Sequence, residues 1–185
     1  MKTTKLSANQ KAIIDIIPNI PNFPIKGVQF KDVTPILAHP KIFNAVMNEL
    51  AKKAKKYKFD CIVAPESRGF FFAIPLAQKL QIPFVPIRKK GKLPRATISV
   101  TETIEYNKVS FEIHKDDIKP NTKVLIMDDL IATGGTIRAI IKLLKSLKAK
   151  PIAALFLVEL PELQGSKEVA KNHIPMDTIV KLSGK

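Results

Sequence analysis

A run of thirteen residues, Val124–Thr136, carries the strongest chemical signal in the sequence. Four apolar residues come first, two adjacent acids follow, and small residues then lead into a segment with the apolar spacing of a helix. Small side chains let backbone N–H groups approach an anion closely, and a helix N-terminus directs free N–H groups and a positive dipole end at the same point. The run therefore predicts a phosphate monoester site, formed by Ala132, Thr133, Gly134, Gly135 and Thr136.

The two acids, Asp128 and Asp129, predict a different ligand beside that phosphate. Carboxylates repel phosphate, but they suit the hydroxyl groups of a sugar, or a Mg²⁺ ion shared with those hydroxyls. We therefore predict a pocket for a ribose 5-phosphate. The chain contains neither Gly-x-x-x-x-Gly-Lys-Ser/Thr nor Gly-x-Gly-x-x-Gly, which excludes a Walker loop and a dinucleotide-binding loop. An ordinary helix cap would not need two acids, two glycines and two threonines in this order.

Several other segments share their residue types and order with one enzyme family. The run Val124–Thr136 resembles the signature with which type I phosphoribosyltransferases bind phosphoribosyl pyrophosphate (PRPP). Further segments narrow the resemblance to the adenine phosphoribosyltransferases, and these are Gly27–Thr34, Pro65–Phe70, Arg88–Pro94, Ile104–Tyr106 and Phe111–His114. The resemblance implies purine salvage, in which adenine and PRPP give AMP and pyrophosphate with inversion at ribose C1. It also implies a Mg²⁺ cofactor and a homodimer.

Two loops at the ends of predicted strands supply donors for a polyphosphate. Arg68 follows the apolar segment Asp60–Ala64, and Arg88 follows Ile82–Ile87. Guanidinium groups bind phosphate oxygens in pairs, so both side chains suit an anion that leaves during a reaction. The resemblance implies that the pyrophosphate group is held by Ser67, Arg68, Gly69, Arg88, Lys89, Lys92 and Tyr106. It implies no direct protein ligand for Mg²⁺, which PRPP and pyrophosphate would mainly hold, with the two acids nearby.

Residues 89–109 are polar and mixed, with β-branched residues but little core, which predicts a mobile loop around Glu105 and Tyr106. The resemblance makes it a β lid over PRPP, with Glu105 close to the base, where a carboxylate could accept a proton from adenine. Two residues depart from the family pattern here, since Asn107 stands where glycine is usual and Glu102 where tyrosine is usual. Asparagine tolerates the left-handed conformation better than most residues, so the turn can survive.

The resemblance also implies an apolar pair around the base. Adenine would stack between Phe30 and Leu130, since flat apolar walls suit a purine. Backbone groups near Gln29 and Lys31 would recognise the purine edge, although Lys31 replaces the family's usual arginine. Catalysis would be electrostatic, because the acids would stabilise a positive ribose while Mg²⁺ and the arginines stabilise the departing pyrophosphate. The catalytic residues predicted are Arg68, Glu105, Asp128 and Asp129.

The elements that must position these residues alternate along the chain. Apolar strands without polar alternation are predicted at Asp60–Ala64, Ile82–Ile87, Lys123–Met127 and Ile152–Val158. Helices are predicted at residues 4–17, from Pro40 to Ala54, at Phe70–Leu80 and at Thr136–Leu147. Strands buried on both faces and separated by helices indicate an α/β fold with a mainly parallel sheet, whose ligands bind at the carboxyl ends of the strands.

The whole chain, residues 1–185, is expected to form one domain. The resemblance implies the type I phosphoribosyltransferase fold, with helices on both faces of the sheet. Its parts would be an N-terminal helix and hood at residues 1–34, a core at 35–160 and the lid at 95–109. The hood would contribute to the base site.

The composition limits the choice of partners and location. The chain carries 31 Lys and Arg against 16 Asp and Glu, a formal charge of +15, and such a field attracts anions of many kinds. Cys61 is the only cysteine and lies in an apolar run, so we expect a buried thiol and no intrachain disulfide. No signal peptide and no apolar stretch of about 18 residues is recognisable, so we predict a cytoplasmic protein that needs no membrane.

Two other functions stay open on the sequence. A 6-oxopurine phosphoribosyltransferase, acting on hypoxanthine, guanine or xanthine, would share the PRPP loop but need a donor to the purine 6-oxygen. A PRPP-sensing regulator would keep that loop and bind nucleic acid through its basic surface. Such a regulator could lose the lid glutamate and the pyrophosphate donors, whereas Glu105, Arg68 and Arg88 are all present. The residues therefore favour an enzyme that requires no nucleic acid.

Overall fold

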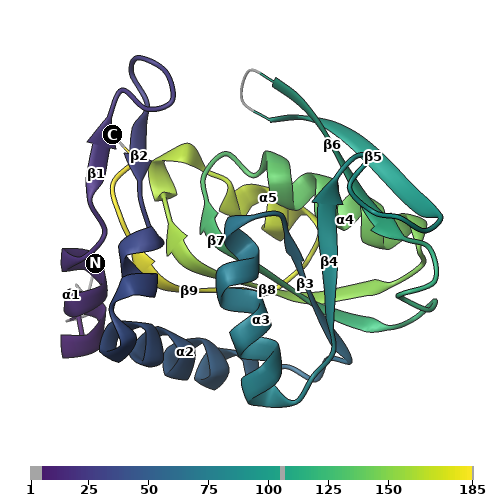
Figure 1. Ribbon diagram of the computed structural model, residues 1–185, viewed down its shortest axis with the longest axis horizontal. Helices are drawn as coiled ribbons and strands as arrows, with labels where there is room; N and C mark the ends of the chain where they lie inside the picture. The colour runs from purple at the N-terminus through teal and green to yellow at the C-terminus, as the bar shows by residue number, and fades with distance from the viewer. Residues whose placement is uncertain (1–5, 105–106, 185) are drawn as a thin grey trace.

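The computed structural model describes residues 6–104 and 107–184, and its centre is a seven-stranded sheet (Figure 1). In spatial order the strands are β5 (Thr97–Ile104), β6 (Asn107–His114), β4 (Phe84–Lys89), β3 (Cys61–Pro65), β7 (Lys123–Ile131), β8 (Lys150–Glu159) and β9 (Met176–Lys181). Strands β4, β3, β7, β8 and β9 pair in parallel, while β6 pairs antiparallel with both β4 and β5. The predicted α/β class with a mainly parallel sheet is confirmed.

Helices cover both faces of this sheet, as predicted (Figure 1). One face carries α1 (Ala8–Asp15), α2 (Pro40–Ala54) and α3 (Arg68–Leu80), and the other carries α4 (Gly135–Ser146) and α5 (Ser166–Lys171). Successive residues of a strand point to opposite faces. Ile62 and Ala64 therefore belong to the core of α2 and α3, whereas Cys61 and Val63 belong to the core of α4. This double burial explains why the central strands lack polar alternation.

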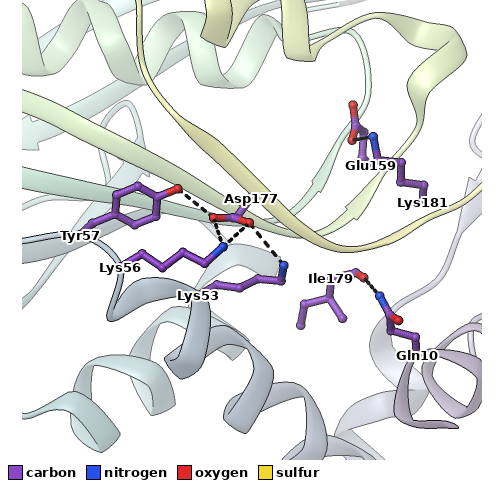
Figure 2. Close-up of polar contacts among 8 residues, drawn as sticks. All are labelled: Gln10, Lys53, Lys56, Tyr57, Glu159, Asp177, Ile179 and Lys181. Atoms are coloured by element: carbon purple, nitrogen blue, oxygen red, sulfur yellow. Dashed lines mark hydrogen bonds and ion pairs between the residues drawn. The ribbon is translucent and has the colours of Figure 1, made fainter. Parts of the chain in front are cut away.

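The described N-terminal helix, α1, is shorter than the predicted helix at residues 4–17, because Ser7 caps it. The Ser7 hydroxyl accepts a hydrogen bond from the backbone N–H of Gln10, and the Gln10 side chain accepts one from the backbone N–H of Ser7. Gln10 Nε2 also donates to the carbonyl of Ile179 on β9 at 2.9 Å (Figure 2). Residues 1–5 lie outside the described part of the chain.

Strand β9 lies beyond the last predicted element, and polar contacts fix it to the end of α2 (Figure 2). Asp177 on β9 accepts a hydrogen bond from the Tyr57 hydroxyl at 2.8 Å. It also forms ion pairs with Lys53 at 3.3 Å and Lys56 at 3.1 Å. Part of the lysine-rich segment after α2 therefore holds the edge of the sheet.

Two antiparallel hairpins stand at opposite ends of the molecule (Figure 1). Strands β1 (Asn19–Pro21) and β2 (Gln29–Lys31) form a separate two-stranded sheet in the predicted hood region. Strands β5 and β6 form a longer hairpin, so most of the predicted lid segment 95–109 is β structure. Glu105 and Tyr106, between these two strands, lie outside the described residues. Among the described helices, none combines the length and apolarity that crossing a bilayer requires.

Candidate active site

The predicted phosphate loop joins the central strand β7 to helix α4. β7 continues past its predicted end as far as Ile131, so both acids lie within the strand. The segment 132–134 follows, and α4 begins at Gly135 with its N-terminus directed at the end of β7. Gly134 has a φ of 87°, and a Cβ at this position would lie 2.8 Å from Glu168 Cγ. This position therefore requires glycine.

One cavity of about 290 Å³ brings together residues predicted to bind phosphate, ribose and base. The predicted residues that line it are Gln29, Phe30, Lys31, Arg68, Asp128, Asp129, Leu130, Ala132, Thr133, Gly134, Gly135 and Thr136. They come from the hood, from the start of α3, from β7 and from the loop that opens α4. The cavity thus lies at the carboxyl end of the central parallel strands, where ligands bind in open α/β sheets.

A second cavity, of about 330 Å³, contains part of the predicted pyrophosphate site. Its lining includes Ser67 and Lys89, which were predicted to bind pyrophosphate, together with Glu66 and Phe111. It shares Arg68, Asp128, Asp129 and Thr136 with the first cavity. Because the acids and Arg68 line both, they stand between a space for base and ribose phosphate and a space for a polyphosphate.

Asp128 and Asp129 are buried beside these cavities, and their burial raises the pKa of both carboxyl groups. Burial raises the pKa of Asp128, and the neighbouring charge of Asp129 raises it further. Burial also raises the pKa of Asp129, while the positive charge of Arg68 lowers it. Asp128 Oδ1 accepts the backbone N–H of Asp129 at 2.9 Å. A pair of buried carboxylates is stabilised by hydroxyl donors or a cation, which is what a ribose with Mg²⁺ offers.

Arg68 connects the acids to the base side of the site. Its Nε lies 2.8 Å from Asp129 Oδ2, although the direction of the N–H does not make this ion pair a hydrogen bond. Its guanidinium carbon lies 4.9 Å from the centroid of the Phe30 ring, within the range of a cation–π contact. The next residue is Gly69, where a Cβ would lie 2.9 Å from Asp128 Oδ1. Glycine therefore lets α3 begin this close to the acid.

The other predicted pyrophosphate donors are arranged differently. Arg88 Nε donates to Glu66 Oε2 at 3.0 Å, and its Nη1 donates to the carbonyl of Lys92 at 3.1 Å. Neither Arg88 nor Lys92 lines the two cavities described above. The hydrogen bond from Arg88 lowers the pKa of Glu66, so this carboxylate is charged and keeps the guanidinium beside it. The backbone N–H groups of Lys92 and Leu93 both donate to buried Glu112, which fixes the turn.

The hood leaves one backbone edge of β2 without a strand partner among the described residues. Asn19 on β1 forms hydrogen bonds with two side chains of β2, because it donates to Gln29 Oε1 at 2.7 Å and accepts from Lys31 Nζ at 2.9 Å. Strand β2 has β1 as its strand neighbour in the described structure, so its other edge is not paired with a strand. Peptide groups at that edge suit a purine edge, and Phe30 packs against Phe23 with ring centroids 5.0 Å apart.

Comparisons with known proteins identify the family of this chain. The profile of the phosphoribosyl transferase domain family matches residues 32–182. The chain is 46% identical over 181 residues to adenine phosphoribosyltransferase of Mycoplasmoides gallisepticum, a match that covers 97% of this chain and 99% of that protein. It is 54% identical over 148 residues to adenine phosphoribosyltransferase of Malacoplasma penetrans, covering 80% and 86%. The chain belongs to the adenine phosphoribosyltransferase family.

Solved structures of this family share the fold. Adenine phosphoribosyltransferase of Thermoanaerobacter pseudethanolicus is 45% identical and superposes with a TM-score of 0.89, covering 94% of this chain and 99% of that one. The Saccharomyces cerevisiae protein is 35% identical, with a TM-score of 0.85 and the same coverage of 94% and 99%. The type I phosphoribosyltransferase fold expected from the resemblance is thereby confirmed.

Asp128 and Asp129 suit a site at which substrate-bound Mg²⁺ lies nearby. Among the described residues, no group of three or more His, Cys, Asp and Glu side chains is placed to hold a metal ion alone. Mg²⁺ commonly keeps several waters and binds through one or two carboxylates plus substrate phosphates. With PRPP and pyrophosphate as the main ligands, Asp128 and Asp129 would lie near the ion, which fits two adjacent buried carboxylates beside a polyphosphate space.

Several residues that line the first cavity were missed from the sequence. Pro24 and Val28 come from the hood, and Phe156, Leu160 and Leu163 come from β8 and the segment after it. A signal for the second group was present, because a parallel strand was predicted at Ile152–Val158. Its carboxyl end had to reach the same edge of the sheet as the end of β7.

Proposed function

We propose that this protein transfers the ribose 5-phosphate group of PRPP to adenine, giving AMP and pyrophosphate in purine salvage. The observation that carries the proposal is the single cavity in which the phosphate loop, the acid pair, Arg68 and the two predicted base contacts, Phe30 and Leu130, meet. The names of the relatives support it, and the similar Saccharomyces cerevisiae protein was solved with adenine and an imino-altritol bisphosphate.

Binding is proposed to start from the phosphate loop. Backbone N–H groups of residues 132–136 and the hydroxyls of Thr133 and Thr136 hold the 5-phosphate at the N-terminus of α4. The ribose hydroxyls then face Asp128 and Asp129. The pyrophosphate group extends into the second cavity, toward Ser67, Arg68 and Lys89, with Gly69 next to Arg68 on α3 and with Arg88 and Lys92 in the neighbouring turn.

The chemistry proposed for these groups is electrostatic. As the bond from C1 to the pyrophosphate breaks, positive charge develops on the ribose, and the acid pair stabilises it through the hydroxyls. Arg68 stabilises the negative charge on the departing pyrophosphate. When bound, Mg²⁺ would act as a Lewis acid on the pyrophosphate oxygens. Adenine, held between Phe30 and Leu130, attacks C1 from the opposite face, which inverts it.

Two predicted roles belong to residues outside the described structure. We propose that Glu105 accepts the proton that adenine loses, and that Tyr106 contacts the pyrophosphate. In the sequence they stand between the end of β5 and the start of β6. Closure of this hairpin over the site would exclude water from the reacting atoms.

We further propose a cytoplasmic homodimer. Phe71 and Ile74 lie one turn apart on α3, and 39% and 47% of their surfaces are exposed. Exposed apolar residues at this spacing suit a helix that packs against a second copy. A cytoplasmic location suits the substrates, because PRPP and AMP carry charges that do not cross a bilayer unaided. Analytical ultracentrifugation of the wild type and of Phe71→Glu would test the dimer, since the substitution should yield monomers.

A panel of bases tests the proposed function. Purified protein is incubated with PRPP, Mg²⁺ and either adenine, hypoxanthine, guanine or xanthine, and the nucleotide formed is measured by chromatography. The proposal expects AMP from adenine at a rate far above the nucleotides from the other bases. Faster turnover of a 6-oxopurine would favour the other salvage class, and absence of any nucleotide would overturn both.

A further inference from the structure

The β5–β6 hairpin is attached to the rest of the sheet by only part of its length. The β4–β6 ladder pairs Arg88↔Glu112 and Lys89↔Phe111, and the backbone N–H of Lys90 donates to the carbonyl of Ser110 at 2.9 Å. Along the rest of β6, from Asn107 to Val109, this ladder has no further rung among the described residues. The far end of the hairpin, at Thr101–Thr103 and Asn107–Val109, is therefore attached to the rest of the protein by contacts other than pairing with β4.

Helix α4 supplies those contacts through one carboxylate, Glu102 on β5. Lys142 Nζ lies 2.6 Å from Glu102 Oε2, and Arg138 Nε lies 3.3 Å from Glu102 Oε1. Arg138 also donates to the carbonyl of Thr103 at 3.2 Å. Both oxygens of Glu102 are thus engaged by cations of α4, and β5 packs against this helix (Figure 1).

The charge of Glu102 is secured by its surroundings. Its side chain is 13% exposed, and the hydrogen bonds from Lys142 and Arg138 lower its pKa. An isolated surface ion pair contributes little, but a largely enclosed carboxylate held by two cations forms a network with defined geometry. The network can therefore hold the hairpin in one position.

Arg138 connects the same network to the phosphate loop. Its backbone N–H donates to the carbonyl of Gly134 at 3.0 Å. Its Nη1 lies 3.7 Å from Glu168 Oε2, and the Glu168 side chain packs against Gly134. One arginine therefore contacts the phosphate loop with its backbone, and α5 and the hairpin with its side chain.

We propose that Glu102, with Arg138 and Lys142, is a positioning residue for the reaction: it fixes the β5–β6 hairpin relative to the phosphate loop. The inference rests on the proposed function. It is specific to this chain, because Glu102 stands where the family pattern has tyrosine. The network acts on the reacting groups through the hairpin and leaves the 5-phosphate contacts themselves intact.

The test compares Glu102→Gln with Asp117→Asn. Glu102→Gln removes the charge and keeps the shape of the side chain. Asp117→Asn weakens the ion pair with Arg95, which is also 2.6 Å long but joins the residues just before β5 and just after β6, outside the Glu102 network. Because coupling networks contribute roughly a 2- to 30-fold change in rate or affinity, Glu102→Gln should lower kcat by that factor. Its affinity for ribose 5-phosphate should equal that of the wild type, and Asp117→Asn should change neither quantity.

Amide hydrogen exchange and a double variant test the anchoring of the hairpin further. Amide hydrogen exchange should be faster in residues 97–104 and 107–114 of Glu102→Gln than in the wild type, with no such change in Asp117→Asn. Lys142→Met should have a smaller effect, and the double variant should be no slower than Glu102→Gln alone. Unchanged kcat and exchange in Glu102→Gln, or a loss explained by ribose 5-phosphate affinity, would overturn it. If the wild type formed no AMP, the proposed function would fail, and the exchange comparison would still decide the anchoring.

Discussion

Replacing Arg68 with alanine should slow the reaction and, at the same time, strengthen the binding of adenine. Arg68 Nε lies 2.8 Å from Asp129 Oδ2, and its guanidinium carbon lies 4.9 Å from the Phe30 centroid. As a donor to the departing pyrophosphate, this side chain acts in the transition state. Loss of one preorganised donor of this kind costs about 10²–10³ in kcat. We therefore expect Arg68→Ala to lower kcat by about that factor.

Adenine should bind more tightly to Arg68→Ala than to the wild type. The guanidinium contacts the ring on which adenine is proposed to stack, within the same cavity, so base and guanidinium compete for that ring. A cation–π contact at an exposed site contributes about 0.5–1 kcal/mol, and about 1.4 kcal/mol is tenfold in affinity. Arg68→Ala should therefore lower the KM for adenine about 2- to 5-fold.

The pH profile of kcat/KM tests the ion pair between Arg68 and Asp129 independently. Burial raises the pKa of Asp129, and the charge of Arg68 lowers it. Arg68→Ala removes the lowering contribution, so the carboxylate becomes protonated at a higher pH than in the wild type. The acid limb of kcat/KM should therefore move to higher pH.

Initial rates of AMP formation at varied adenine and saturating PRPP, from acid to neutral pH, measure all three quantities. Lys89→Ala is the matched control, because Lys89 lines the polyphosphate cavity and not the base cavity. This control should lower kcat and leave the KM for adenine unchanged. An increased KM for adenine in Arg68→Ala, or turnover equal to that of the wild type, would refute the reasoning.

Three further predictions concern packing and stability. Gly69→Ala should lower kcat in steady-state assays, because its Cβ would lie 2.9 Å from Asp128 Oδ1, and wild-type turnover would contradict this. Asp177→Asn should lower the free energy of unfolding by about 1–3 kcal/mol, as read from urea denaturation, because Asp177 bonds Tyr57 and two lysines. Burial, with the Asp177 hydrogen bond and charge, raises the Tyr57 pKa from 10.0 to about 12. Because the pKa of Tyr57 is higher in the folded state, the contribution of its hydroxyl to the free energy of unfolding is present below pH 10 and is lost as pH rises toward 12. Urea denaturation across this pH range should show the loss in the wild type and not in Tyr57→Phe.

The central sheet and its phosphate loop could be predicted because several local signals agree there. Strand β3 is apolar at Cys61, Ile62, Val63 and Ala64, which requires burial on both faces. The small residues after Ile131 allow a close backbone approach to a ligand. Resemblance then supplied the base contacts, which composition and spacing alone did not show.

Other features depend on contacts between distant residues and had no local signal. Helix α5 has six residues, too few to show helical periodicity, and β9 is an edge strand of mixed polarity. The continuation of β7 through Asp128 and Asp129 contradicts strand propensity, and it is stabilised by Arg68 from another element. Likewise, the pairing of Arg88 with Glu66 joins two loops that are neighbours only after folding.

The most direct test of the account is calorimetric titration of the protein with PRPP in the presence of Mg²⁺. We expect one PRPP to bind per chain, and we expect severe weakening in Gly134→Val, which forces a side chain into a left-handed backbone position against Glu168. Absence of PRPP binding by the wild type, or equal affinity in a folded Gly134→Val variant, would contradict it.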